Sequence, residues 1–106
     1  MEMDRDLLLR RIKDCLQHAY GDRIQGVVLY GSEARGDADP ESDIDLLVLL
    51  TGPVDLWQDL RRIIHALYDL QMELDRSIHA MPVDVEAFRV GRYSLYRLAN
   101  KEGVFV

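Results

Sequence analysis

Apolar residues recur at helical spacing in two stretches of the chain. The first stripe predicts an amphipathic helix over residues 4–20 that ends at Gly21, and it consists of Leu8, Ile12, Cys15, Leu16 and Ala19. The second predicts a long helix over residues 54–71, and it consists of Leu56, Leu60, Ile63, Ile64, Leu67 and Leu70. Residues 84–101 are also expected to be helical, with a break at Gly91.

Short apolar runs bounded by turn residues predict the strands, at residues 27–30, 43–50, 74–81 and 103–106. Pro82 is expected to end the third of them, because proline cannot donate a hydrogen bond to a sheet. A short helix over residues 32–37 and a turn over 38–42 connect the first two. The order α-β-α-β-α-β-α-β predicts an α/β (α+β) fold, with helices packed on a small sheet in a single domain over residues 1–106.

Composition and charge narrow the classes of function. The chain has 106 residues and a net charge of −6, whereas a protein that grips a nucleic-acid backbone is normally basic. One cysteine excludes an intrachain disulfide, and one cysteine with three scattered histidines does not form a zinc ligand set. The charged start resembles no signal peptide, and the longest apolar run, Leu46–Leu50, is too short to span a membrane. We therefore expect a cytoplasmic protein.

A phosphate site is indicated where the first predicted strand ends. Gly31 lets the backbone approach a ligand closely, and Ser32 is a good N-cap for the helix that follows. The free N–H groups at a helix N-terminus attract anions.

A metal site is indicated by Asp43 and Asp45, which point to the same face of a strand. They precede Leu46–Leu50, which is apolar on both faces, so a charge without a binding partner would be energetically costly there. Mg²⁺ is typically held by one or two carboxylates and substrate phosphates. Asp75, at the start of the third predicted strand, is the best candidate for a third carboxylate.

These residues resemble a known family. Gly31-Ser32, ten residues and then Asp43-x-Asp45 is similar to the signature of the DNA-polymerase-β-like nucleotidyltransferase superfamily. Residues 29–37 and 42–48, together with the closing Lys101-Glu102-Gly103-Val104, resemble its minimal nucleotidyltransferase (MNT) branch. One departure is Glu33, where many relatives carry a basic or aromatic residue; with Asp39 it makes the phosphate loop more acidic.

The resemblance implies a polymerase-β-like nucleotidyltransferase fold and a role for each site residue. Asp43 and Asp45 would hold two Mg²⁺ ions, and Asp75 would hold the catalytic ion and help to deprotonate the attacking hydroxyl. Gly31 and Ser32 would bind the β and γ phosphates of ATP. The resemblance also implies an antitoxin that transfers AMP onto a tyrosine of a small helical HEPN toxin.

Other residues have two interpretations. Arg35 could contact phosphate or pair with Asp37 or Asp39. His79 shares strand parity with Asp75, but it is interpreted as a packed or solvated strand residue. Trp57 and Tyr68, on the long predicted helix, are interpreted as core or partner contacts. A basic cluster could reflect a helix C-terminal preference, or could attract an acidic partner or the nucleotide; it comprises Arg89, Arg92, Arg97 and Lys101.

Three functions compete on the sequence alone: a transferase that modifies a partner protein, an antitoxin that only occludes its partner, and a transferase for a small molecule such as an aminoglycoside. The intact carboxylates favour catalysis, and the short length disfavours an enclosed small-molecule pocket. No membrane contact is expected, nucleic acid is disfavoured by charge, and a homo-oligomer is compatible with the sequence.

Overall fold

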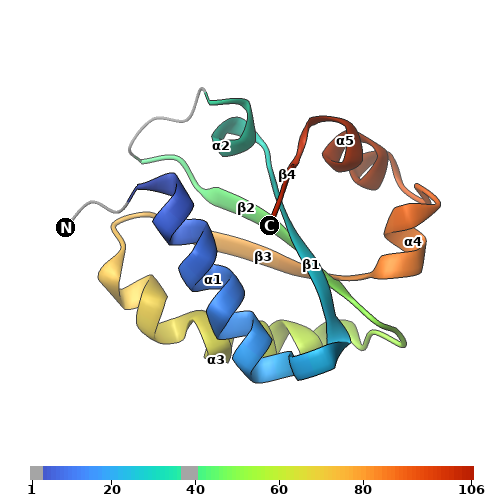
Figure 1. Ribbon diagram of the computed structural model, residues 1–106, viewed down its shortest axis with the longest axis horizontal. Helices are drawn as coiled ribbons and strands as arrows, with labels where there is room; N and C mark the ends of the chain where they lie inside the picture. Colours follow the sequence, from blue (N-terminus) through green and yellow to red (C-terminus); the bar gives the residue numbers. More distant parts are fainter. Residues whose placement is uncertain (1–3, 37–40) are drawn as a thin grey trace.

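The computed structural model describes residues 4–36 and 41–106. Its strands are β1 (Ile24–Tyr30), β2 (Ile44–Leu50), β3 (Ile78–Asp84) and β4 (Val104–Phe105). Its helices are α1 (Arg5–Tyr20), α2 (Ser32–Arg35), α3 (Leu56–Glu73), α4 (Val85–Arg89) and α5 (Ser94–Glu102), and a 3₁₀ turn, η1 (Gly21–Arg23), follows α1. The strands form one mixed sheet in the order β3-β2-β1-β4, with β2 parallel to β3 and the other pairs antiparallel (Figure 1). The predicted fold class, α+β on a small mixed sheet, is confirmed.

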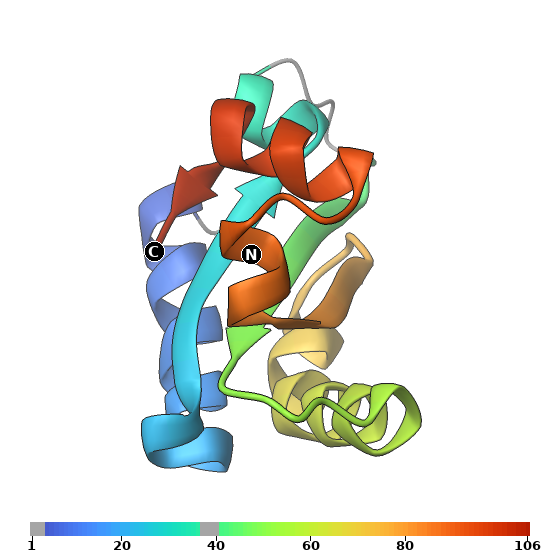
Figure 2. The same cartoon turned by 90° about the vertical axis from the view of Figure 1, so that its right-hand side faces the viewer.

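Helices cover both faces of this sheet. Helices α1 and α3 lie on one face, and α4 and α5 lie on the other (Figures 1 and 2). Strand β2 is buried on both sides, since Leu46 and Val48 pack under α1 and α3 while Leu47 and Leu49 pack under α4 and α5. This burial explains why β2 is apolar at consecutive positions rather than at alternate ones.

The ends of the first and third helices follow ordinary capping chemistry. The Asp4 carboxylate accepts from the Leu7 N–H at the start of α1, and the Asp55 carboxylate accepts from the Gln58 N–H at the start of α3. Gly21 ends α1 with a φ of 57°, as predicted. The break predicted at Gly91 separates α4 from α5. None of the helices in the described residues is both long and apolar enough to cross a membrane.

Several predicted boundaries were wrong. Strand β3 covers Ile78–Asp84 rather than residues 74–81, and Pro82 lies inside it. Proline is tolerated there because β3 is an edge strand, in which an N–H group can be absent without leaving a neighbour unpaired. Strand β1 begins three residues earlier than predicted, at Ile24. Gly31, not Ser32, occupies the N-cap position of α2, and no side chain caps that helix. Asp37 and Asp39 lie outside the described residues.

The apolar stripe predicted for the long helix is only partly buried. Ile63, Leu67 and Leu70 enter the core, but Leu56 and Ile64 are exposed. Asp59 takes the remaining buried position, with only 4% of its surface exposed. It is held by Arg23, so the face of α3 that packs inward differs from the face that hydrophobicity alone predicts.

Candidate active site

Three polar side chains form a row across one face of the sheet. In the strand register, Tyr30 of β1 lies opposite Asp45 of β2, and Asp45 lies opposite His79 of β3. Residues that are directly paired across strands project to the same face. Asp43 precedes β2 by one residue, and its Oδ2 lies 3.7 Å from Nδ1 of His79. Together with Asp43, the row therefore places a phenol, two carboxylates and an imidazole in one neighbourhood.

The loop after β1 presses directly against one of these carboxylates. Gly31 has a φ of 75° and a ψ of −155°, a conformation that is essentially restricted to glycine. A Cβ at this position would lie 2.8 Å from Oδ2 of Asp45, so any side chain here would displace the carboxylate. The predicted need for glycine has a physical reason: the backbone of the loop and Asp45 occupy adjoining space.

Arg76 holds the loop and the acidic strand together. Its guanidinium donates to Oε2 of Glu33 at 2.6 Å and to the backbone oxygen of Ser42 at 2.8 Å. Both side chains of the ion pair are largely buried, with 19% and 14% of their surfaces exposed. Gln71 supports Arg76 in turn, by donating to its backbone oxygen at 2.7 Å. Glu33 stands where many relatives carry a basic or aromatic residue. Its negative charge is compensated within the chain, because the carboxylate is paired with the Arg76 guanidinium.

The electrostatic environment of the row favours the arrival of positive charge. Burial raises the pKa of Asp45, and the nearby Asp43 carboxylate raises it further, while His79 lowers it. Burial also raises the pKa of Tyr30, and the Asp45 carboxylate adds to this effect. A cation bound at the two carboxylates would relieve both the desolvation and the repulsion.

A groove of about 450 Å³ leads away from the row along the edge of the sheet. Tyr30, Asp45 and His79 line it near the site, and mostly apolar residues of α3 and β3 line the rest. Any acceptor that approaches Asp45 through this groove would pass along α3.

The structure brings Asp43 and Asp45 together but does not add the predicted third carboxylate. Asp75 is exposed in the loop that precedes β3. Asp84 is at the far end of β3, opposite Leu50, where its carboxylate caps α4. Within residues 4–36 and 41–106, no group of three or more acidic, histidine or cysteine side chains is arranged to hold a metal ion. Two carboxylates nevertheless suit Mg²⁺, which commonly completes its coordination with phosphate oxygens and water.

Sequence reasoning passed over three residues of this neighbourhood. By local pattern Tyr30 is an ordinary strand residue and His79 is a packed or solvated one, and no motif distinguishes Arg76. Only the strand register could have revealed the first two, because it places residues 49 positions apart in the chain on one face of the sheet.

The basic cluster has partly local roles: Arg89 pairs with Glu86, and Arg97 donates to the backbone oxygen of Gly91. Arg35 is exposed at the end of α2.

A family model for the nucleotidyltransferase domain matches residues 9–96, which include every predicted site residue. The chain belongs to this family. The resemblance to the nucleotidyltransferase superfamily is therefore confirmed, and so is its fold.

Two curated relatives are similar to part of the chain. Two proteins of Methanocaldococcus jannaschii, each named for an inferred protein adenylyltransferase activity, are 40% identical over 53 and 43 residues. These matches cover 50% and 41% of this chain but only 51% and 43% of the relatives, so the chain matches about half the length of each.

Solved structures share the fold at low sequence identity. A toxin–antitoxin structure with AMP-PNP is 21% identical with a TM-score of 0.64, and the match covers 91% of this chain and 69% of that one. The MntA–HpeT toxin–antitoxin structure, in a mutant form with a tyrosine replaced by alanine, is 18% identical with a TM-score of 0.62. That match covers 99% of this chain and 72% of the other.

Proposed function

We propose that this protein is a Mg²⁺-dependent adenylyltransferase that transfers AMP from ATP to a tyrosine hydroxyl of a small helical HEPN-type toxin and thereby acts as an antitoxin. The observation that carries the proposal is the contact between the Gly31 loop and Asp45, beside Asp43. It unites a backbone suited to phosphate with carboxylates suited to a metal ion. The family membership and the names of the relatives support the same chemistry.

The reaction makes one bond and breaks one. The acceptor oxygen attacks the α-phosphorus of ATP, the bond from that phosphorus to the bridging oxygen breaks, and pyrophosphate leaves. The proton of the acceptor hydroxyl passes to a carboxylate of the site or to water. Mg²⁺, when bound, stabilises the charge on the attacking and leaving oxygens.

Within this proposal each residue of the chain has a defined part. Asp43 and Asp45 hold Mg²⁺, and the Gly31 and Ser32 backbone binds the β and γ phosphates. Arg76 keeps that loop in position by holding Glu33. Arg35, exposed at the end of α2, stays a proposed phosphate contact. Asp75 stays a predicted third ligand, although the structure does not gather it with the pair.

The test is mass spectrometry of the product of the neighbouring open reading frame, after co-expression. Wild-type protein should yield a toxin that carries AMP on tyrosine, and Asp43→Asn with Asp45→Asn should yield none. Asp14→Asn, an exposed acid on α1, is the matched control and should leave the modification unchanged. Asp75→Asn measures the contribution of the third predicted ligand.

The exposed apolar face of α3 favours a second candidate, an antitoxin that silences its partner by occlusion alone. An unmodified toxin that is tightly bound and inactive would contradict transfer and establish occlusion in its place.

A further inference from the structure

The outer face of α3 carries apolar side chains that nothing in the described chain covers. Trp57, Ile64, Tyr68 and Met72 have 70%, 59%, 56% and 63% of their surfaces exposed. Their spacing of seven, four and four residues aligns them on one side of the helix. We name these four residues the α3 stripe; it extends about 22 Å at 1.5 Å per residue.

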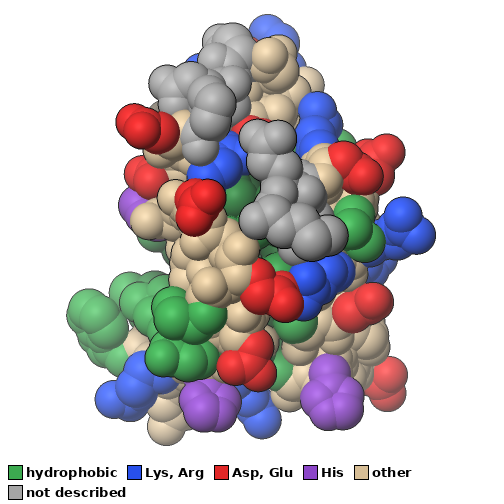
Figure 3. All heavy atoms as spheres, turned by 90° about the vertical axis from the view of Figure 1, so that its left-hand side faces the viewer, with side chains coloured by type: hydrophobic (Ala, Val, Ile, Leu, Met, Phe, Trp, Pro, Cys, Tyr) green, Lys and Arg blue, Asp and Glu red, His purple; other side chains and the backbone are tan. Residues whose placement is uncertain are grey.

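Soluble proteins rarely leave an apolar surface of this kind in water unless it binds something. A hydrophobic patch is visible in Figure 3, with cationic side chains next to it.

The α3 stripe is continuous with the candidate active site. Ile64 and Tyr68 line the groove of about 450 Å³ that reaches Asp45 and His79. The same two residues border a second, wider hollow on the other side of α3. A macromolecule that delivers a hydroxyl to Asp45 along the groove would therefore contact the α3 stripe as it does so.

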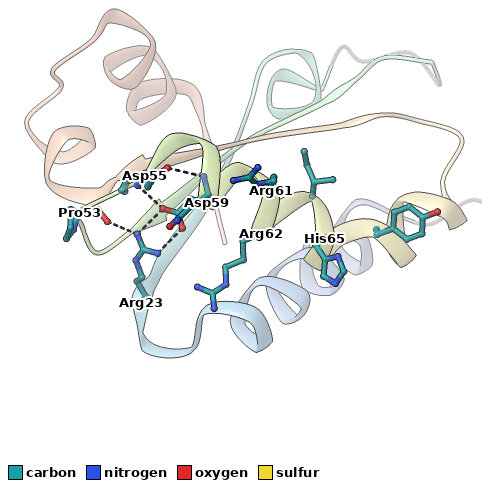
Figure 4. A pocket seen from close by; sticks show the side chains of 11 residues that line it. Arg23, Pro53, Asp55, Asp59, Arg61, Arg62 and His65 are labelled. Carbon is teal, nitrogen blue, oxygen red and sulfur yellow. Dashed lines mark hydrogen bonds and ion pairs between the residues drawn. The ribbon is translucent and has the colours of Figure 1, made fainter.

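Two arginines of α3 lie beside the α3 stripe although the whole chain is acidic. Arg61, Arg62 and His65 project from the same helix into the wider hollow (Figure 4). Arg62 lies over the ring of Tyr20, at 5.1 Å from its centroid. Within the described ranges, residues 4–36 and 41–106, no carboxylate forms an ion pair with Arg61. The guanidinium of Arg61 is thus available to an acidic side chain of a partner, whereas the exposed Asp69 lies two turns further along the helix.

A second copy of this chain is the alternative occupant. In a two-fold contact between antiparallel α3 helices, Arg61 of one copy would lie near the exposed Asp69 of the other. The groove that leads from the α3 stripe to Asp45 favours the acceptor protein instead, because the molecule that carries the hydroxyl has to reach the carboxylates.

We propose that the α3 stripe docks an amphipathic helix of the acceptor protein, whose apolar side is flanked by Asp and Glu residues. Such a helix would lay its apolar face on Trp57, Ile64, Tyr68 and Met72, and set a carboxylate against Arg61. This inference rests on the proposed function for the identity of the partner, but the docking itself requires no ATP.

The experiment uses two designed helical peptides and a readout built into the surface. Both peptides carry leucines at helical spacing; one has flanking Glu residues and its twin has Lys. Trp57 is the only tryptophan of the chain, so docking on the α3 stripe should shift its emission to shorter wavelength. We expect the Glu peptide to bind about tenfold more tightly than the Lys peptide. Arg61→Glu should reverse this order, whereas Arg10→Glu, on the exposed side of α1, should not.

Apolar contact is tested separately. Ile64→Asp should weaken binding of the Glu peptide by about tenfold or more. Val90→Asp, a change at a 73% exposed apolar residue outside α3, should leave it unchanged. Circular dichroism of each variant confirms that it is folded.

Equal binding of the two peptides, binding of neither, or insensitivity to Ile64→Asp would overturn the proposal. So would a wild-type dimer that Ile64→Asp converts to monomer, because a second copy would then be the occupant.

Failure of the proposed function gives a different pattern. Asp43→Asn with Asp45→Asn should abolish AMP transfer to the co-expressed toxin yet leave both peptide and toxin bound. Ile64→Asp should weaken both binding and transfer. A toxin that is never modified but requires the α3 stripe for binding would contradict transfer and support docking.

Discussion

Replacing Gly31 with alanine should damage the active site through two separate strains. The backbone conformation at φ 75° and ψ −155° costs a non-glycine residue about 1–3 kcal/mol. The new Cβ would also lie 2.8 Å from Oδ2 of Asp45, and moving that side chain off its preferred rotamer costs about 0.5–1.5 kcal/mol. Together these strains predict a loss of about 2–4 kcal/mol in the free energy of unfolding, measured by urea denaturation.

Activity should fall further than stability suggests, because the displaced group is a proposed metal ligand. Misplacing a reacting or positioning group by about 1 Å can cost about 100-fold in rate. We therefore expect AMP transfer, measured at a temperature where the variant is folded, to drop by about two orders of magnitude.

Gly36 provides the matched control. It also has a positive φ, of 80°, with a ψ of 12°, but no described atom lies within 4 Å of a Cβ built there. Gly36→Ala should therefore cost only the left-handed backbone penalty of about 1–2 kcal/mol and keep its transfer activity. If Gly31→Ala loses no more stability or activity than Gly36→Ala, the close approach to Asp45 has no functional meaning.

Two further predictions concern buried charge. In the absence of Mg²⁺, Asp45→Asn should leave thermal stability unchanged or slightly higher, because it removes a partly buried charge beside another carboxylate; a large drop in melting temperature would show that Asp45 is structural. Asp59→Asn should lower the free energy of unfolding by about 2–4 kcal/mol at neutral pH. This is less than expected for a fully buried ion pair, because 29% of the Arg23 side chain is exposed. Burial alone would raise the pKa of Asp59, but hydrogen bonds, chiefly from Arg23, lower it below its usual range, so this stabilisation should disappear as pH falls through the acidic range. Urea titrations at several pH values check this, with Asp14→Asn as the control. If the difference in the free energy of unfolding between wild type and Asp59→Asn stays constant with pH, the ion-pair explanation is contradicted.

The parts of the fold that sequence predicted well depend on local chemistry. The order of the elements follows from helical and strand periodicity, and Gly21 and Gly91 mark real breaks because they adopt positive φ values. The Asp43 and Asp45 pair was recognisable because charge directly precedes a strand that is apolar on both faces. None of these inferences requires knowledge of which strands are neighbours.

The parts that sequence missed depend on tertiary context. The sequence predicts that Pro82 ends its strand, since a proline disrupts a central strand; it is accommodated because β3 lies at the sheet edge. The position of His79 opposite Asp45 follows only from the parallel register of β2 and β3, which no local pattern predicts. Glu33 is an unfavourable charge by sequence alone, but Arg76, 43 residues later, pairs with it.

The burial of Asp59 connects the packing of α3 with the surface it presents. Arg23 donates to both carboxylate oxygens of Asp59 and to the backbone oxygens of Thr51 and Pro53, so one side chain fixes the start of α3 relative to the end of β2. Once Asp59 faces inward, residues five and nine positions later must turn away from the core by helical geometry, and these are Ile64 and Tyr68. The polar clamp at one end of the helix therefore sets which side chains line the groove toward Asp45. An apolar residue at position 59 could fill the same space, but it would leave Tyr20 and Arg23 without their carboxylate partner and would leave the rotation of α3 to be decided by two competing hydrophobic faces. The ion pair thus specifies one rotation of the helix, at the cost of burying a charge, and the chosen rotation is the one that keeps an apolar surface beside the carboxylates.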